Sequence, residues 1–217
     1  MKLFFEQTGS GKPLIMIHGN GSSHQSFEIC IEILKQHFTV YALDSRGQGA
    51  NPKEKELHYT DMADDVIEFC HDHDLDHPVI YGFSDGGIIA LLVAIKSPQL
   101  PSHLIVSGAN IVPSGLKAKF QIPNRFKYWK TKDPLYKLML TEPHITEEML
   151  HAIQAPTLIT AGEKDIVKER ETRRIAQSIP GSKIIILPGE GHGTYITHDR
   201  PEKIASIILE ETRFAED

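Results

Sequence analysis

The sequence predicts an α/β fold in which helices cover both faces of a mostly parallel sheet. Short β-branched segments alternate with helical patterns along most of the chain, which is the order expected of strands joined by crossover helices. The strand-like segments are apolar at successive positions, and one helix-like segment is apolar on all sides. Both features are typical of a sheet that is covered on its two faces, because neither face of such a strand meets water.

Seven short segments are predicted to form strands. The first is expected at the edge of the sheet, and the others follow at intervals that leave room for helices between them. The predicted strands are Leu3–Glu6, Leu14–Ile17, Thr39–Leu43, Val79–Tyr81, Leu104–Ser107, Thr157–Thr160 and Lys183–Leu187.

Helices are predicted in three of the intervening segments. Apolar residues recur at intervals of three and four from Phe27 to Phe38 and from Ala63 to Cys70, which predicts amphipathic surface helices. Gly87–Lys96 is apolar all round and is predicted to be a buried helix. Pro98 and Pro101 follow its end.

The alternation is interrupted between Ile111 and Ala155, where the chain becomes aromatic and basic. A helix over Thr146–Ile153 is expected to lead into the next strand, so residues 111–142 are predicted to be a short lid inserted over one end of the sheet. Trp129 in this insertion is a candidate substrate contact. Residues 1–217 are otherwise predicted to form a single α/β domain, as the length of the chain suggests.

Composition and charge argue against several classes of partner. Lys and Arg number 23 against 29 Asp and Glu, giving a net charge of −6, so we expect neither nucleic acid nor a membrane as partner. The longest wholly apolar run, Ile88–Ile95, is far shorter than a membrane span. No secretory signal is recognisable at the N-terminus, and Cys30 and Cys70 lack CxxC spacing. We therefore expect a cytoplasmic protein with two buried thiols.

A nucleophile elbow is predicted where a strand meets the buried helix. Gly82, Ser84 and Gly86 form a G-x-S-x-G pattern between Val79–Tyr81 and Gly87–Lys96. The serine of such an elbow occupies a strained turn, and glycines flank it because a Cβ there would collide with neighbouring atoms. Ser84 is therefore the predicted nucleophile, and a glycine-rich crossing without chemistry is the alternative.

A serine hydroxyl needs a general base, which is itself oriented by a carboxylate. Asp165 and His192 each follow the carboxyl end of a predicted strand, at the sheet edge where Ser84 is expected. His192 is the predicted base and Asp165 the predicted acid. Glu163 and Glu190 are the competing acids, and Glu163 is disfavoured because it follows its strand too closely to reach sideways.

Two backbone N–H groups are expected to stabilise the oxyanion that forms on attack. One belongs to Asp85, the residue after the nucleophile, and the other is assigned to Asn20 in the loop after Leu14–Ile17. His18 is expected to brace this loop. The Asp85 side chain is also a candidate substrate contact, with stabilisation of the helix N-terminus as its alternative role.

Other motifs are incomplete. Gly19-x-Gly21 suggests a dinucleotide site, but His24 stands at the third glycine position. Gly9–Lys12 lacks two of the residues of a phosphate loop. The histidines and aspartates of residues 71–77 lie at the polar end of a predicted helix, where solvation explains them without a metal. Neither a cofactor nor a metal is predicted.

Four separated motifs resemble those of the α/β-hydrolase-fold serine hydrolases. They occur in the order of that family, and the residues around Ser84 are similar to its biphenyl-hydrolase-like branch, which includes amino-acid ester hydrolases. Two features differ from the usual pattern: the insertion is shorter than the usual cap, and Asn51 stands where serine is common. The motifs are His18-Gly19, Asp44-x-Arg46-Gly47-x-Gly49, Gly82-x-Ser84-x-Gly86-Gly87, and Asp165 with His192.

The predicted function is therefore that of a cofactor-independent serine hydrolase acting on a small carboxylic ester. Ser84 attacks, His192 transfers the proton and Asp165 fixes the imidazole tautomer. Thioesters, amides and lactones are alternative substrates, and Asp85 favours α-amino acid esters if its carboxylate faces the pocket. A ligand-binding receptor with little turnover is the alternative function on the same scaffold. The sequence predicts no oligomeric state.

Overall fold

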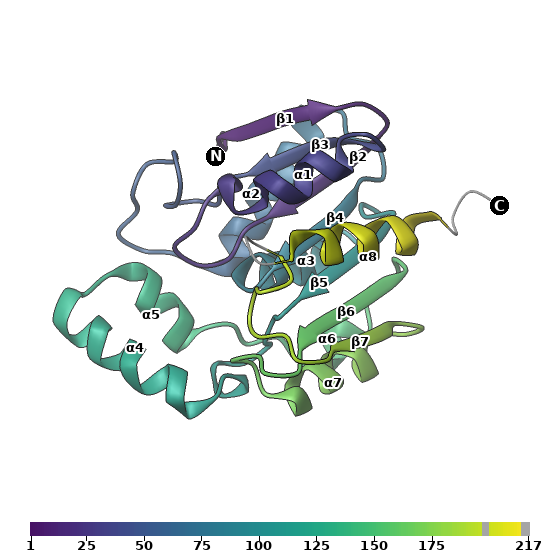
Figure 1. Cartoon of the computed structure of the whole chain (residues 1–217). Helices are drawn as coiled ribbons and strands as arrows, with labels where there is room; N and C mark the ends of the chain where they lie inside the picture. The colour runs from purple at the N-terminus through teal and green to yellow at the C-terminus, as the bar shows by residue number, and fades with distance from the viewer. Residues whose placement is uncertain (197–199, 214–217) are drawn as a thin grey trace.

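The fold is built on a single seven-stranded sheet (Figure 1). The computed structural model describes residues 1–196 and 200–213. The strand order is β1-β3-β2-β4-β5-β6-β7, with β1 antiparallel to β3 and the other neighbours parallel. The predicted α/β fold is thus confirmed. The strands are β1 (Phe5–Gly9), β2 (Lys12–Ile17), β3 (Phe38–Leu43), β4 (Val79–Phe83), β5 (His103–Ser107), β6 (Thr157–Gly162) and β7 (Lys183–Leu187).

Every predicted strand is present, and the largest difference concerns the first. The strand expected at Leu3–Glu6 instead runs from Phe5 to Gly9, in register with Leu43 to Thr39 of β3. Apolar patterning could not reveal this shift, because an edge strand is half exposed and accepts polar side chains along its length.

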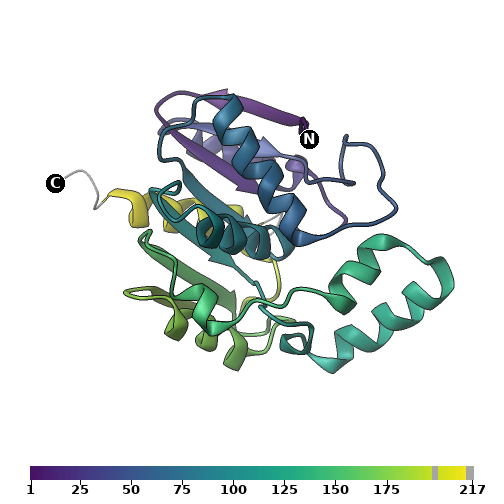
Figure 2. The ribbon, with the colours of Figure 1, turned by 180° about the vertical axis from the view of Figure 1, so that it is seen from behind.

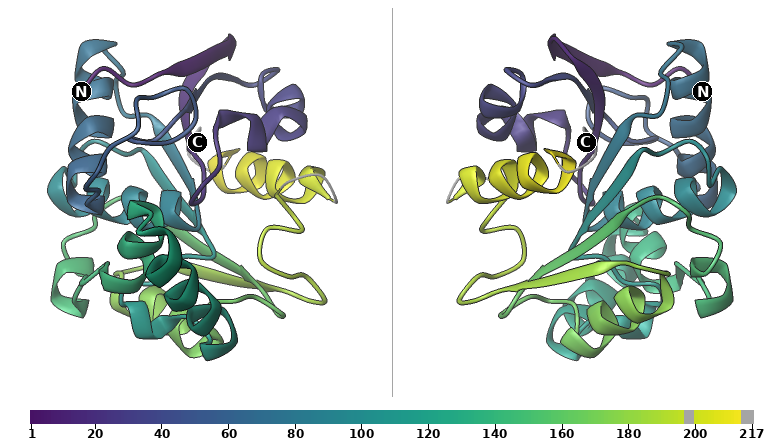
Figure 3. Two further views of the ribbon diagram at one scale, coloured as in Figure 1. Left: turned by 90° about the vertical axis from the view of Figure 1, so that its left-hand side faces the viewer. Right: turned by 90° about the vertical axis from the view of Figure 1, so that its right-hand side faces the viewer.

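Helices cover both faces of the sheet (Figures 2 and 3). One face carries α1 (Glu28–Leu34) and α8 (Pro201–Arg213), and the other carries α2 (Tyr59–Asp72), α3 (Asp85–Lys96), α6 (Glu147–Leu150) and α7 (Glu169–Ser178). Each face therefore has its own apolar core. Helix α3 is apolar all round because it is enclosed between the sheet and α2.

Two predicted helices are shorter than expected. The pattern from Phe27 to Phe38 extends beyond α1, since Phe27 ends the 3₁₀ turn η1 (His24–Phe27) and Phe38 begins β3. The helix expected over Thr146–Ile153 is reduced to α6. In both cases apolar residues at helical spacing continue into the neighbouring turn or strand, where they are buried by the same core.

Both cysteines are free and buried, as predicted. Burial raises the pKa of the Cys30 and Cys70 thiols to about 12. Among the described residues, no helix is long and apolar enough to cross a membrane.

The segment predicted as a lid forms two helices beyond the carboxyl ends of the strands (Figure 1). A short 3₁₀ turn, η2 (Pro113–Gly115), precedes α4 (Ala118–Thr131) and α5 (Pro134–Thr141). Lys132 ends α4 in a left-handed conformation, and Asp133 caps α5 by accepting a hydrogen bond from Leu135 N at 2.8 Å. At the base of the insertion, Ile145 N donates to Ile111 O at 2.9 Å, which brings the two ends of the segment together.

The loop after β3 has a structural role. Asp44 is fully buried and accepts hydrogen bonds from the backbone N–H groups of His24 and Ala50, both at 2.7 Å. Asn51, which departs from the family pattern, donates to Asp44 O and accepts from Phe4 N. Its amide therefore ties the end of β3 to the chain entering β1, a bridge for which a serine side chain is too short.

Helix α3 begins unusually close to the sheet. A Cβ added to Gly86 would lie 2.0 Å from Ile17 O, and one added to Gly82 would lie 2.2 Å from Gly86 O. Non-bonded carbon and oxygen atoms do not approach this closely. Only glycine therefore allows the first turn of α3 to meet the ends of β2 and β4 at this distance.

Gly86→Ala should therefore destabilise the protein by about 2 kcal/mol or more, because either the helix or the strand must move. Urea denaturation measures the loss. Gly191→Ala is the matched control, since its Cβ would meet only Thr194 Cγ2, at 3.4 Å. It should change the free energy of unfolding by no more than about 0.5 kcal/mol. Equal losses in the two variants would contradict this account of position 86.

Candidate active site

Ser84 lies in a sharp turn between β4 and α3. Its backbone has φ 55° and ψ −116°, a strained combination for a residue with a side chain. Ser84 N donates to Ser107 O of β5 at 2.8 Å, which holds the turn against the sheet. The turn leaves the hydroxyl at the carboxyl end of the strand, as a nucleophile elbow requires.

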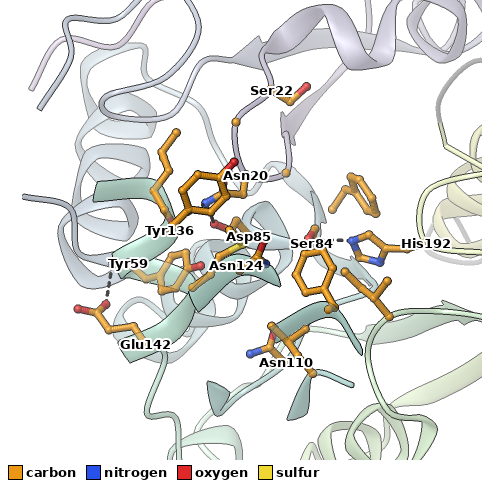
Figure 4. A pocket seen from close by; sticks show the side chains of 18 of the residues that line it. Asn20, Ser22, Tyr59, Ser84, Asp85, Asn110, Asn124, Tyr136, Glu142 and His192 are labelled. Atoms are coloured by element: carbon orange, nitrogen blue, oxygen red, sulfur yellow. Dashed lines mark hydrogen bonds between the residues drawn. The ribbon is translucent and has the colours of Figure 1, made fainter. Parts of the chain in front are cut away.

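The structure brings the three predicted catalytic residues together. His192 Nε2 lies 3.0 Å from Ser84 Oγ, and His192 Nδ1 lies 2.7 Å from Asp165 Oδ1. The loops after β6 and β7 supply Asp165 and His192, so the parallel sheet places all three side chains at one edge (Figure 4 shows Ser84 and His192). Phe83 packs against the imidazole with ring centroids 4.9 Å apart.

Asp165 is buried but remains disposed to carry a negative charge. Burial disfavours the ionised form, whereas hydrogen bonds from His192 and from Val167 N favour it. The balance lowers the pKa of the Asp165 carboxyl below its usual value. An ionised Asp165 accepts the Nδ1 proton of His192 and leaves Nε2 free to accept the proton of Ser84.

The competing acids have other partners. Glu163 accepts a hydrogen bond from Gly189 N at 2.7 Å. Glu190 pairs with Lys203 and accepts from Thr194 Oγ1. Neither carboxylate contacts His192 in the described part of the chain, so the geometry favours Asp165.

His18 braces the loop after β2, as expected. Its imidazole is almost fully buried, with Nε2 accepting from Ser45 N at 3.0 Å and Nδ1 lying 2.7 Å from Gly19 O. Burial lowers the pKa of His18, which favours the neutral form that this pair of contacts needs. The ring therefore links the loop after β2 to the loop after β3.

Asn20 and Asp85, the two residues assigned to the oxyanion hole, are joined through their side chains. Asn20 Nδ2 donates to Asp85 Oδ2 at 2.8 Å and also reaches Leu135 O of α5 at 3.4 Å. Asp85 is only 4% exposed, and burial raises the pKa of its carboxyl, an effect that the hydrogen bond from Asn20 partly offsets. The backbone N–H of Asp85 belongs to the first turn of α3, where helical N–H groups lack intrahelical acceptors.

A cavity of about 590 Å³ lies above Ser84 (Figure 4). Ser84, Asp85 and His192 line it from the sheet, and Asn124 and Tyr136 line it from the lid. This arrangement covers Ser84 while leaving room for a small molecule.

One end of the cavity is acidic. Glu142 and Tyr59 line the wall there, and Asp85 lies on the same side of Ser84, away from His192 (Figure 4). Glu142 accepts from Tyr59 N at 3.1 Å and pairs with His58 at 2.6 Å, and this contact raises the pKa of His58. Burial and the charge of Asp85 raise the pKa of the Tyr59 phenol.

Trp129 does not line the cavity, contrary to the prediction that it contacts substrate. Its side chain is 69% exposed and lies near Phe126, with ring centroids 5.9 Å apart. Helix α4 instead turns Phe120, Asn124 and Lys127 toward the cavity. The sequence shows that the insertion is aromatic, but it does not show which face of its helix meets the sheet.

Comparison with known families agrees with the fold. The family described as alpha/beta hydrolase fold matches residues 12–133, more than half of the chain. The chain belongs to the α/β-hydrolase fold family.

Several known α/β-hydrolases are similar to it over nearly their whole length. AB hydrolase superfamily protein YisY of Bacillus subtilis is 26% identical, over 96% of this chain and 94% of its own. Serine hydrolase BPHL of Homo sapiens is also 26% identical, over 97% of this chain and 84% of its own. A thermophilic esterase from Thermogutta terrifontis superposes with a TM-score of 0.83 at 22% identity, covering 99% of this chain and 94% of its own. The predicted resemblance to serine hydrolases near the biphenyl-hydrolase-like branch is confirmed.

The sequence of this α/β-hydrolase does not reveal the acidic end of its cavity. Glu142 and Tyr59 come from segments that no motif marks, and only the folded lid brings Glu142 beside α2. The Asn20–Asp85 contact could have been predicted from the sequence. Both residues were assigned to one oxyanion hole, and the Asn20 amide can donate a hydrogen bond to the Asp85 carboxylate. Residues whose N–H groups converge on one atom have neighbouring backbones, so a side-chain contact between them is worth testing at the sequence level.

The hydrogen-bonded chain from Asp165 to Ser84 predicts selective labelling of Ser84 by a fluorophosphonate, because His192 accepts the serine proton as phosphorus is attacked. Mass spectrometry of the modified peptide identifies the site. Ser84→Ala should remain unlabelled. Asp165→Asn should be labelled at least about 10³-fold more slowly than wild type, because the His192 imidazole is then held in the wrong tautomer. Equal labelling of Ser84→Ala and wild type would refute the assignment.

Proposed function

We propose that this α/β-hydrolase is a serine hydrolase of small carboxylic esters that works through an acyl-enzyme. The observation that carries the proposal is the unbroken contact from Asp165 through His192 to Ser84 at the floor of a covered cavity. Its serine hydrolase relatives support the same chemistry.

In this mechanism Ser84 Oγ attacks the ester carbonyl as His192 Nε2 takes the hydroxyl proton. The carbonyl oxygen becomes an oxyanion, which the backbone N–H groups of Asn20 and Asp85 stabilise. When the tetrahedral intermediate collapses, the C–O bond to the alcohol breaks and His192 returns the proton to the departing oxygen. Water then attacks the acyl-enzyme with His192 as base, which releases the carboxylic acid and restores Ser84.

The cover over Ser84 limits the expected length of the acyl group. The cavity has walls on the sheet side and on the lid side, so an extended long chain must fold within it, leave it or displace α4 and α5. Short acyl groups fit beside Ser84 without any of these changes.

Wild-type protein should hydrolyse p-nitrophenyl acetate and butyrate with a higher kcat/KM than the decanoate. Ser84→Ala should lower kcat by several orders of magnitude without loss of the folded state, as judged by its thermal midpoint. A preference for decanoate would contradict the short-acyl proposal. A fall in kcat of only a few fold in Ser84→Ala would contradict the role of Ser84. Tight binding without turnover across a panel of esters, thioesters, amides and lactones would favour the receptor alternative.

Asp85 provides a basis for selecting substrates that carry an amine. Its carboxylate lines the cavity next to the nucleophile, and Asn20 satisfies it without neutralising it. An ammonium group about 6 Å away would gain about 3 kcal/mol at an effective dielectric constant near 20, from which desolvation subtracts. A net preference of about tenfold to a hundredfold for α-amino acid esters is the expected result. The lid wall also carries a cation, Lys127, but this residue has a partner of its own. Its Nζ lies over the Tyr136 ring, 5.4 Å from the ring centroid.

The test compares an alanine ester with the matching propionate ester. Wild type should prefer the alanine ester, and Asp85→Asn, which keeps the backbone N–H, should lose that preference. The preference should also decline as the pH falls toward the raised pKa of Asp85, at a higher pH than an ordinary aspartate requires. Effects of pH on the triad act on both esters alike and cancel in the ratio, and comparison with Asp85→Asn separates the share of Asp85 from that of Glu142, which lines the same end of the cavity. Glu163→Gln removes a carboxylate outside the cavity and is the control; equal selectivity in wild type and Asp85→Asn would refute the role of the charge.

A further inference from the structure

The outer face of α4 carries an exposed apolar stripe. Ile122, Phe126 and Trp129 are 66%, 64% and 69% exposed, and their spacing of four and three residues puts them on one side of the helix. The side chains that line the cavity, among them Phe120 and Asn124, lie on the opposite side. The stripe is therefore not part of the substrate site or of the core.

Basic residues flank this stripe. By helical spacing, Lys119 and Lys130 lie along one side of it and Arg125 along the other, and Lys132 follows the end of the helix. All four are exposed, and none forms an ion pair with a carboxylate among residues 1–196 and 200–213. The segment from residue 111 to residue 132 contains no Asp or Glu, in a chain whose net charge is −6.

The charge decides which partner suits the stripe. In a two-fold dimer through α4, the basic flanks of one copy would meet those of the other, and like charges across an interface are unfavourable. A partner that is both anionic and apolar suits the basic flanks and the apolar stripe at once. Trp, Phe and Ile on one face of a helix, with Lys and Arg beside them, form a surface that suits the boundary of an anionic lipid layer.

We propose that α4 docks on the surface of a bilayer containing anionic lipids. The three apolar side chains enter the boundary between headgroups and acyl chains, and the flanking cations lie at the level of the lipid phosphates. The helix is on the outside of the molecule, where a flat surface can approach it (Figures 1 and 2). Net charge alone predicts no membrane partner, but it averages over a basic helix and an acidic remainder.

Docking of this kind is reversible and depends on salt. Three apolar side chains give a small buried area, so the cations must supply part of the attraction, and the acidic remainder of the protein opposes it. Binding should therefore need anionic lipid and weaken about tenfold or more when salt screens the charges.

The protein contains its own reporter, since Trp129 is the only tryptophan in the chain. Vesicles of phosphatidylcholine with phosphatidylglycerol should shift Trp129 emission to shorter wavelength and carry the protein with them on flotation. Vesicles of phosphatidylcholine alone should do neither. Absence of both effects with the anionic vesicles, or equal binding to the two kinds of vesicle, overturns the proposal.

Matched variants locate the contact. Ile122→Ser with Phe126→Ser keeps Trp129 as reporter and should weaken vesicle binding at least tenfold, as should Arg125→Gln with Lys130→Gln. Ile184→Ser with Ile185→Ser removes exposed apolar surface from β7 and should bind as wild type does. Thermal midpoints and far-UV circular dichroism check that each variant is folded. Unchanged binding in both α4 variants would overturn the proposal.

Two further measurements separate the alternative partners. Sedimentation velocity in the absence of lipid should show no association that depends on Trp129 or its neighbours. Polyglutamate should leave the emission of Trp129 unshifted, because it offers charge without an apolar phase. A shift with polyglutamate but not with vesicles would favour an acidic protein, and self-association through α4 would favour a second copy; either result overturns the proposal. None of these measurements depends on the triad, so they succeed or fail independently of the proposed hydrolase activity.

Discussion

The close approach of α3 to the ends of β2 and β4 is the constraint on which the rest of the site depends. Gly82 and Gly86 allow it, since a Cβ at either position would overlap the neighbouring backbone. With the helix that near the sheet, the connection at Ser84 must turn sharply and adopt a positive φ. The same turn points Ser84 at His192 and starts α3 at Asp85, beside the loop that carries Asn20. The position of Ser84, the start of α3 at Asp85 and the contact with Asn20 therefore share one geometric origin.

The oxyanion side of the site combines positioning with charge. A hydrogen bond between Asn20 and Asp85 ties the loop after β2 to the start of α3, so each fixes the other. The same carboxylate is buried at the acidic end of the cavity, where ionisation is costly. A substrate cation would offset the cost of ionising Asp85. A carboxylate at this position can therefore contribute to binding in a way that an amide cannot.

The sequence was most informative where local chemistry and topology agree. Glycines mark the elbow, and the rule that parallel strands end at one edge predicts that Asp165 and His192 lie near Ser84. It was least informative in the lid. Phe126 and Trp129 are residue types that are usually buried. Their exposure depends instead on the rotation of α4 about its axis, which is set by the packing of α4 on α5. Glu142 was missed for a related reason, since its partners His58 and Tyr59 are distant in sequence.

The closed base of the insertion makes the lid a replaceable part. Because Ile145 N bonds to Ile111 O, the chain leaves the sheet and returns to it at nearly the same place, whatever lies between. Such a segment can be lengthened, shortened or exchanged for that of a relative without changing the register of β5 and β6. A change in this segment can therefore alter the cover of the cavity and the exposed face of α4, while the strands beneath keep Ser84, His192 and Asp165 in place.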